Sequence, residues 1–143
     1  MVFMKKILIR LFIMPAIIFG IASCSSKGGG GGGGGGGTEA TLAVTLNPPV
    51  NSVQPAAPQT DFPLTVSITS TMPPQGVTID VKAAPDGSTT NFFTESKSTT
   101  AANNNFTITG TPTGVVCVVT VTVTSKTKAT NTVTLSYRYT RKP

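Results

Sequence analysis

From residue 38 to the carboxyl end, hydrophobic and polar residues alternate in short segments separated by turn-forming residues. A period of two places successive side chains on opposite faces of an extended chain, and it is typical of half-buried β-strands. No stretch of this region has a convincing helical period. The apolar faces of the predicted strands are Leu42, Val44 and Leu46; Leu64, Val66 and Ile68; Val77, Ile79 and Val81; Phe106 and Ile108; and Val133, Leu135, Tyr137 and Tyr139.

Two further stretches predict strands by other patterns. The run from Val115 to Val119 is continuously apolar and then alternates as Val121 and Val123 against threonines, which predicts a central strand that enters a better-covered region. The segment 89–96, with Phe92 and Phe93, predicts another strand or an edge. Prolines at positions 48, 49, 55, 58, 73, 74, 85 and 112 lie between the apolar runs, where they leave strand ladders intact.

Short antiparallel strands with one apolar face each must bury those faces against one another, and two packed sheets do this in about 100 residues. We therefore expect residues 38–143 to form one all-β domain, an immunoglobulin-like antiparallel β-sandwich of about seven strands. A small β-barrel is the alternative. The proline-rich segment from Ala40 to Asp61 has two interpretations, as part of the sandwich or as a stiff extension ahead of it.

Three phrases of this region resemble the immunoglobulin-like and cadherin-like modules of bacterial surface proteins. They are Met72-Pro-Pro-Gln-Gly-Val-Thr-Ile-Asp80, Phe106-Thr-Ile-Thr-Gly-Thr-Pro-Thr-Gly114 and the alternating Val119 to Thr124, and the similarity spans Met72 to Tyr139. The resemblance implies that the first phrase opens a strand. It also implies that the Gly-Thr-Pro turn precedes the penultimate strand and that a valine-threonine ladder follows.

The chain departs from antibody domains in its core. It has no tryptophan, no cysteine suited to pair with Cys117, and Val115 where those domains place a corner tyrosine. Cys117 is predicted to be a small buried hydrophobic residue. The calcium sites of cadherins need clustered acids, whereas the five acids of this chain stand singly, at Glu39, Asp61, Asp80, Asp86 and Glu95. No metal and no other cofactor is expected.

The first 23 residues are typical of a secretory signal peptide, with a basic start, an apolar stretch from Leu11 to Ile21 and small residues at the end. The apolar stretch is shorter than the roughly 20 residues that a transmembrane helix needs, and Pro15 and Gly20 interrupt it. The pattern therefore favours a cleaved leader over a permanent membrane span.

The residues Ile21-Ala-Ser-Cys24 resemble the lipobox of bacterial lipoproteins. The resemblance implies a diacylglycerol thioether on Cys24, cleavage before it and acylation of the new amino group, and several acyl chains such as palmitate hold a protein firmly at a membrane. Ser25 stands where an aspartate often signals inner-membrane retention, so the resemblance favours the outer membrane. Residues 24–37 then form a lipidated tether, because the run from Gly28 to Gly37 predicts flexible coil.

Charge and composition exclude several classes of function. Three of the basic residues belong to the leader, and the remaining eight face five acids, so the exported net charge is +3 and nucleic acid is not an expected partner. The chain has no histidine, which removes the usual catalytic triads and most zinc sites. Asp80 with Asp86 or Glu95 is the only carboxylate pairing near in sequence, and Asp86-Gly87 is typical of a turn, so catalysis is not expected.

Lipid, tether and sandwich together predict an envelope lipoprotein that displays a non-catalytic binding or adhesion module. Its partners would be the membrane, through the lipid, and a protein or a glycan. The alternative is a structural envelope protein or an accessory subunit of a larger surface assembly. Phe92 and Phe93 are the candidate contact residues, because in a strand they would point to opposite faces and leave one exposed. Tyr137 and Tyr139 are expected to point inward with their hydroxyls near the rim.

Overall fold

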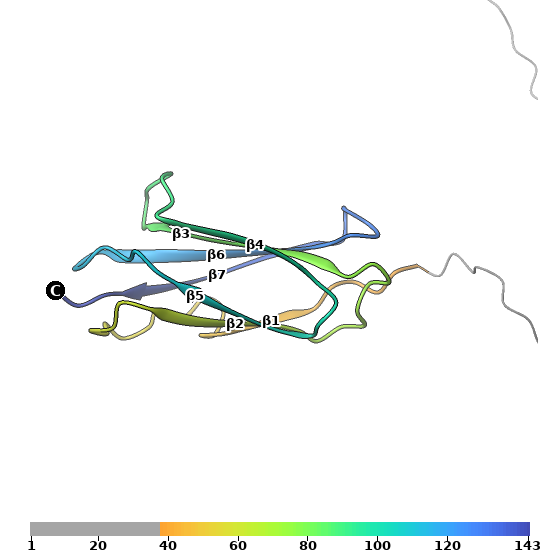
Figure 1. The fold of residues 1–143 in the computed structure, drawn as a ribbon, viewed down its shortest axis with the longest axis horizontal. Helices are drawn as coiled ribbons and strands as arrows, with labels where there is room; N and C mark the ends of the chain where they lie inside the picture. Colours follow the sequence, from red (N-terminus) through yellow and green to blue (C-terminus); the bar gives the residue numbers. More distant parts are fainter. Residues whose placement is uncertain (1–37) are drawn as a thin grey trace, which may run out of the picture. The chain divides into compact units, whose positions relative to one another are not determined.

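The computed structural model describes residues 38–143, and the structural statements below concern this part of the chain. The predicted leader, the predicted lipidation site Cys24 and the glycine run lie outside the described residues. The described part contains seven strands: β1 (Val44–Asn47), β2 (Phe62–Ile68), β3 (Val77–Pro85), β4 (Phe93–Thr99), β5 (Asn103–Ile108), β6 (Val116–Ser125) and β7 (Thr132–Thr140). They form one sheet in the order β1-β2-β5 and another in the order β4-β3-β6-β7 (Figure 1).

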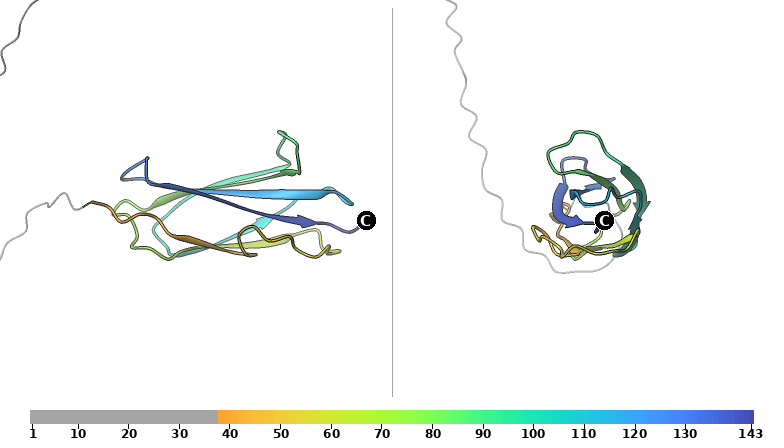
Figure 2. Two further views of the ribbon diagram at one scale, coloured as in Figure 1. Left: turned by 180° about the vertical axis from the view of Figure 1, so that it is seen from behind. Right: turned by 90° about the vertical axis from the view of Figure 1, so that its left-hand side faces the viewer.

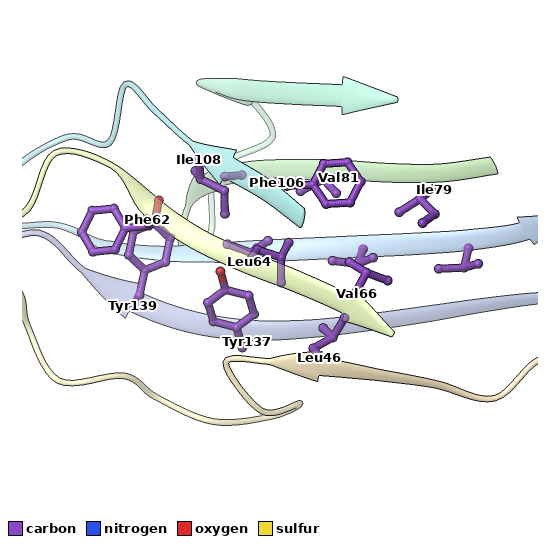
Figure 3. Close-up of a cluster of buried hydrophobic side chains, with 14 of the residues drawn as sticks. Leu46, Phe62, Leu64, Val66, Ile79, Val81, Phe106, Ile108, Tyr137 and Tyr139 are labelled. Atoms are coloured by element: carbon purple, nitrogen blue, oxygen red, sulfur yellow. The ribbon is translucent and has the colours of Figure 1, made fainter. Parts of the chain in front are cut away.

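The hydrophobic core lies between the two sheets and is built from alternate residues of their strands. Val66, Val77 and Val121 have no exposed surface, and the predicted apolar faces of β2, β3, β5 and β6 all point inward. Figure 3 shows side chains from both sheets meeting in this layer. Burying one such side chain contributes roughly 1.5–3 kcal/mol, so the alternation of apolar and polar residues decides which face of each strand turns inward.

The two sheets share no strand ladder, so they are not closed into a barrel, and every named strand pair is antiparallel. The predicted seven-stranded β-sandwich is confirmed, and the small barrel is excluded. The fourth strand pairs with β3 and lies in the sheet of β6 and β7. In constant-type immunoglobulin domains the fourth strand belongs to the other sheet.

The first and second phrases of the surface-module resemblance occupy the positions that the resemblance implies. The Pro-Pro-Gln-Gly phrase forms a turn in which the N–H of Gly76 donates to the carbonyl of Pro73 at 2.8 Å, and β3 starts at the next residue. Gly76 has a φ of +77°, and a Cβ at this position would collide with the carbonyl oxygen of Thr99. The Gly-Thr-Pro phrase precedes β6, which starts at Val116 and is the penultimate strand.

The ladder between β1 and β2 ends where β2 has a proline. Asn47 pairs with Thr65, and the N–H of Thr69 donates to the carbonyl of Ala43, so odd-numbered residues of β2 direct their backbone groups toward β1. The next such residue is Pro63, which has no N–H to donate. The chain therefore leaves the three-stranded sheet after β1.

The segment 48–61 then joins the sandwich at its other sheet. Val53 forms a parallel bridge with Arg138 of β7. The N–H of Gln54 donates to the carbonyl of Arg138 at 2.8 Å, and the N–H of Arg138 donates to the carbonyl of Ser52 at 2.9 Å. This segment covers the edge of β7, so it is a part of the domain and not an extension ahead of it.

Residue 38 and the carboxyl terminus lie at opposite ends of the sandwich, as the views in Figures 1 and 2 show. The end of the sandwich that contains residue 38 also contains three loops, 69–76, 100–102 and 126–131. The segments 48–61, 86–92 and 109–115 lie at the other end, which we call the distal end.

Candidate functional site

The outer face of the four-stranded sheet carries threonine side chains over most of its length. Across β6 and β7 the hydroxyls of Thr124 and Thr132 lie 2.9 Å apart, and those of Thr122 and Thr134 lie 3.3 Å apart. These paired hydroxyls make a regular solvated face without a concentrated charge.

Toward the distal end, the outward positions of β6 change from threonine to valine. Val116 is 43% exposed and Val118 is half-buried. The register places Val118 beside Arg138, and Val53, which is 69% exposed, bridges Arg138 from the other side. We call Val53, Val116 and Val118 the valine patch. The large hydrophobic side chains of residues 38–143 that are exposed, Val53, Val115 and Val116, all lie in or next to this patch.

The exposure of these valines shows that one of the two predictions about β6 is wrong. The strand is central, between β3 and β7, as predicted. The run from Val115 to Val119 is nevertheless not in a better-covered region, because Val115 is 39% and Val116 is 43% exposed. A sandwich has two layers, and nothing in the described part of the chain packs on the outer face of this sheet at that point.

Arg138, which lies between Val53 and Val118 of the valine patch, forms an ion pair with Asp86. The Nε of Arg138 donates to Oδ2 of Asp86 at 3.0 Å, and both side chains are nearly half exposed. Asp86 is held in place because its N–H donates to the carbonyl of Val116 at 2.8 Å. An exposed pair of this kind contributes little to stability, at most about 1 kcal/mol. It does place one positive and one negative group beside the valines.

Phe92 and Phe93 are both half-buried and pack against the core, so the prediction that one of them is exposed is wrong. Phe93 pairs with Ala83, and the N–H of Phe92 donates to the carbonyl of the same Ala83 at 2.9 Å. Two consecutive residues thus face a single partner, as in a β-bulge, which breaks the strict alternation of faces. Whether either ring contacts a ligand stays a prediction.

A hollow of about 160 Å³ lies at the distal end, where β1 has left the edge of β2. Aromatic rings and prolines dominate its wall, which comprises Pro48, Gln54, Pro55, Ala57, Gln59, Phe62, Pro63, Tyr137 and Tyr139. The ring centroids of Phe62 and Tyr139 are 4.4 Å apart, and Figure 3 shows the two rings side by side. The three aromatic residues of the wall are at most 7% exposed, so the hollow presents no open ring face. The proline-rich sequence of segment 48–61 by itself did not predict a hollow here.

Tyr137 and Tyr139 point inward, as predicted, and their hydroxyls are buried. Tyr139 shares a hydrogen bond of 2.7 Å with the hydroxyl of Thr111, whereas the hydroxyl of Tyr137 has no partner in the described part of the protein. Burial raises the pKa of Tyr139 to about 12, although the hydrogen bond with Thr111 acts in the opposite direction and lowers it. Burial, followed by the charge of Tyr139, raises the pKa of Tyr137 further.

Cys117 is fully buried on the inner face of β6, as predicted. Its Sγ lies 3.6 Å from the carbonyl oxygen of Val115. Burial raises the pKa of the thiol, which disfavours the reactive thiolate. The residue therefore acts as a small core side chain.

The carboxylates that lie near one another in the sequence do not come together as a pair. Asp80 lies on the outer face of β3 opposite Ser96, and Glu95 lies on the inner face of β4 opposite Val81. Asp86 is engaged with Arg138. Among residues 38–143, no three His, Cys, Asp or Glu side chains gather as a metal site would require.

Within residues 38–143 we find no helix with the length and apolar character that a membrane crossing requires. Comparisons of the chain with protein-family models, with curated proteins and with solved structures gave no match. The candidate site therefore rests on its own geometry.

Proposed function

We propose that this chain is an envelope lipoprotein, lipidated at Cys24, whose sandwich is a non-catalytic module that binds a protein partner at the distal end. The proposed lipid and tether precede residue 38, and the distal end lies opposite that residue. The tether would attach the module at the end opposite the distal end, which leaves the distal end free to contact a partner.

The valine patch is the observation that carries the proposal. Exposed valines are gathered at one place on a face where the other outward positions of β6 are threonines. Contiguous apolar groups at a surface favour contact with another macromolecule, and arginine beside them is common in interfaces. Arg138 lies in the middle of the patch and supplies that group.

A protein partner fits these features better than a glycan. Sugars are commonly held by open aromatic faces, and the rings at the distal hollow are almost fully buried. The valines and the exposed ion pair suit a protein surface with apolar side chains and one complementary charge.

The binding experiment compares immobilised domains that differ only at the patch. We expect the wild-type domain, residues 38–143, to retain an envelope protein. The double variant Val116→Thr, Val118→Thr should retain about tenfold less of that protein, or less still. Threonine occupies the neighbouring outward positions of β6, so the fold should tolerate it. Thr122→Ser on the same face is the matched control and should retain the partner.

Two results would count against a protein-binding module. One is that no envelope protein distinguishes the wild-type domain from the patch variant. The other is that purified surface polysaccharides bind both equally well. A domain that co-purifies only within a fixed larger assembly would favour the accessory-subunit function instead.

The lipid anchor needs its own experiment. Cells given a tagged fatty acid should label the wild-type chain and not the Cys24→Ala variant, and the variant should leave the membrane fraction. Cys117→Ala is the control, because the other cysteine should not matter for labelling. Equal labelling of Cys24→Ala and the wild type would refute the anchor.

A further inference from the structure

β4 has a free edge along one side of the sandwich. Within residues 38–143 it pairs with β3 alone, whereas the opposite edge of the same sheet is covered by segment 48–61. The five residues from Thr94 to Ser98 are all exposed. A free strand edge presents unpaired backbone groups to solvent and is a template for pairing with another strand.

The directions of the free backbone groups follow from the register. The N–H of Asp86 donates to the carbonyl of Val116, which continues the β3–β6 ladder and points the even-numbered residues of β3 toward β6. The odd-numbered residues of β3 then point toward β4 and hydrogen-bond its odd-numbered residues. It follows that Thr94, Ser96 and Ser98 direct their N–H and C=O groups outward along the free edge.

The two charged residues of β4 are placed symmetrically about Ser96. Glu95 and Lys97 lie on the inner side of the strand, opposite Val81 and Ile79 of β3. Neither takes part in a salt bridge within the described part of the chain. The ammonium of Lys97 lies 5.8 Å from the ring centroid of Phe106.

We propose that β4 pairs antiparallel with β4 of a second copy of this chain, about a twofold axis at Ser96. The outward groups of Thr94, Ser96 and Ser98 then meet those of Ser98, Ser96 and Thr94 in hydrogen-bonded pairs. Glu95 of each copy lies opposite Lys97 of the other, in the closer, non-hydrogen-bonded pairs. The contact is self-complementary, as a twofold interface must be.

The charges of Glu95 and Lys97 also favour this register over the registers that are shifted along β4. Moving the twofold axis by one residue places Glu95 opposite Glu95 or Lys97 opposite Lys97. Opposite charges across a strand pair stabilise it and like charges destabilise it, so only the axis at Ser96 satisfies both residues. Inward charges can also protect an edge from pairing, and a monomer is therefore the outcome that overturns the proposal.

The other strand edges lack these features. Segment 48–61 covers β7, and β1 is only four residues long. β5 contains no charged residue that would select a register. The proposal is independent of the valine patch, which lies on β6 and segment 48–61, so either can fail without the other.

The test measures the oligomeric state of residues 38–143, which contain all seven strands and the whole described core. Sedimentation equilibrium should show a concentration-dependent dimer. Glu95→Lys and Lys97→Glu should each raise the dissociation constant about tenfold or more, because each gives both cross-strand pairs like charges. An equimolar mixture of the two single variants should restore the dimer, and so should the double charge reversal.

Controls separate edge pairing from general effects of charge and folding. Lys82→Glu makes the same charge change as Lys97→Glu on the exposed outer face of β3 and should leave the dimer intact. Ser96→Pro removes the central donor of the free edge and should abolish the dimer, while the urea midpoint stays unchanged at a protein concentration at which the wild type is monomeric. A wild-type domain that is monomeric at its highest soluble concentration, or a mixture that fails to restore the dimer, overturns the proposal.

Discussion

The hydroxyl of Tyr139 lies 2.7 Å from the hydroxyl of Thr111, and both residues are buried. This bond joins β7 to the loop between β5 and β6 at the distal end. Tyr137 lies two residues earlier on the same face and is equally buried, but its hydroxyl has no partner in the described part of the protein. The two tyrosines thus share their burial and differ in one hydrogen bond.

That difference predicts opposite results for the same substitution. Tyr139→Phe leaves the Thr111 hydroxyl unpaired in a buried place and should lower the free energy of unfolding by roughly 1–3 kcal/mol. Tyr137→Phe removes an unsatisfied hydroxyl and should be neutral or slightly stabilising. Urea unfolding of both variants beside the wild-type domain measures the effect. Equal losses of stability would contradict this account.

The tyrosines also predict a loss of stability in alkali. Burial raises the pKa of Tyr139 to about 12 and raises that of Tyr137 as well, while both ionise near their ordinary value of 10 in the unfolded chain. The unfolded state releases protons first, so stability should be complete below pH 10 and should fall as pH rises from 10 to about 12. Urea midpoints measured across this range should decline less in Tyr137→Phe than in the wild type. An unchanged midpoint up to pH 12 would contradict the shift.

Cys117 should be inert in the folded domain. It has no exposed surface, and burial raises the pKa of its thiol, so little thiolate is present to react. A thiol reagent at pH 8 should react at least about a hundredfold more slowly with the native domain than with the urea-unfolded chain, because reaction requires opening of the core. Rapid labelling without denaturant would show that β6 opens readily.

Two glycines provide a matched test of the turns. Gly76 and Gly87 have φ values of +77° and +81°, but a Cβ at Gly76 would collide with Thr99 whereas a Cβ at Gly87 would meet open space. Gly87→Ala should therefore destabilise the domain by roughly 1–2 kcal/mol, from backbone strain alone. Gly76→Ala should cost about 3 kcal/mol or more, because the collision adds to that strain. Thermal unfolding of the two variants distinguishes these effects, and equal melting temperatures would argue against the close approach at Thr99.

Much of the fold could be predicted because strand periodicity is a local property. Leu64, Val66 and Ile68 were expected inside and are buried, and the alternation in β3 and β7 holds likewise. The two phrases around Gly76 and Gly110 also precede strands as expected. The candidate site was less predictable, because a bulge of one residue at Phe92 and Phe93 changes which faces those rings occupy.

The order of residues along the chain determined which positions turn inward, where the turns lie and that no histidine chemistry is available. Only the tertiary structure decided which sheet holds β4, that segment 48–61 covers β7, and that Val53 and Val118 lie on either side of Arg138. The physical reason is the distance in sequence between the residues that interact. Side-chain alternation depends on neighbours in the sequence, whereas the pairing of strands and the gathering of outward side chains depend on contacts between segments far apart in it.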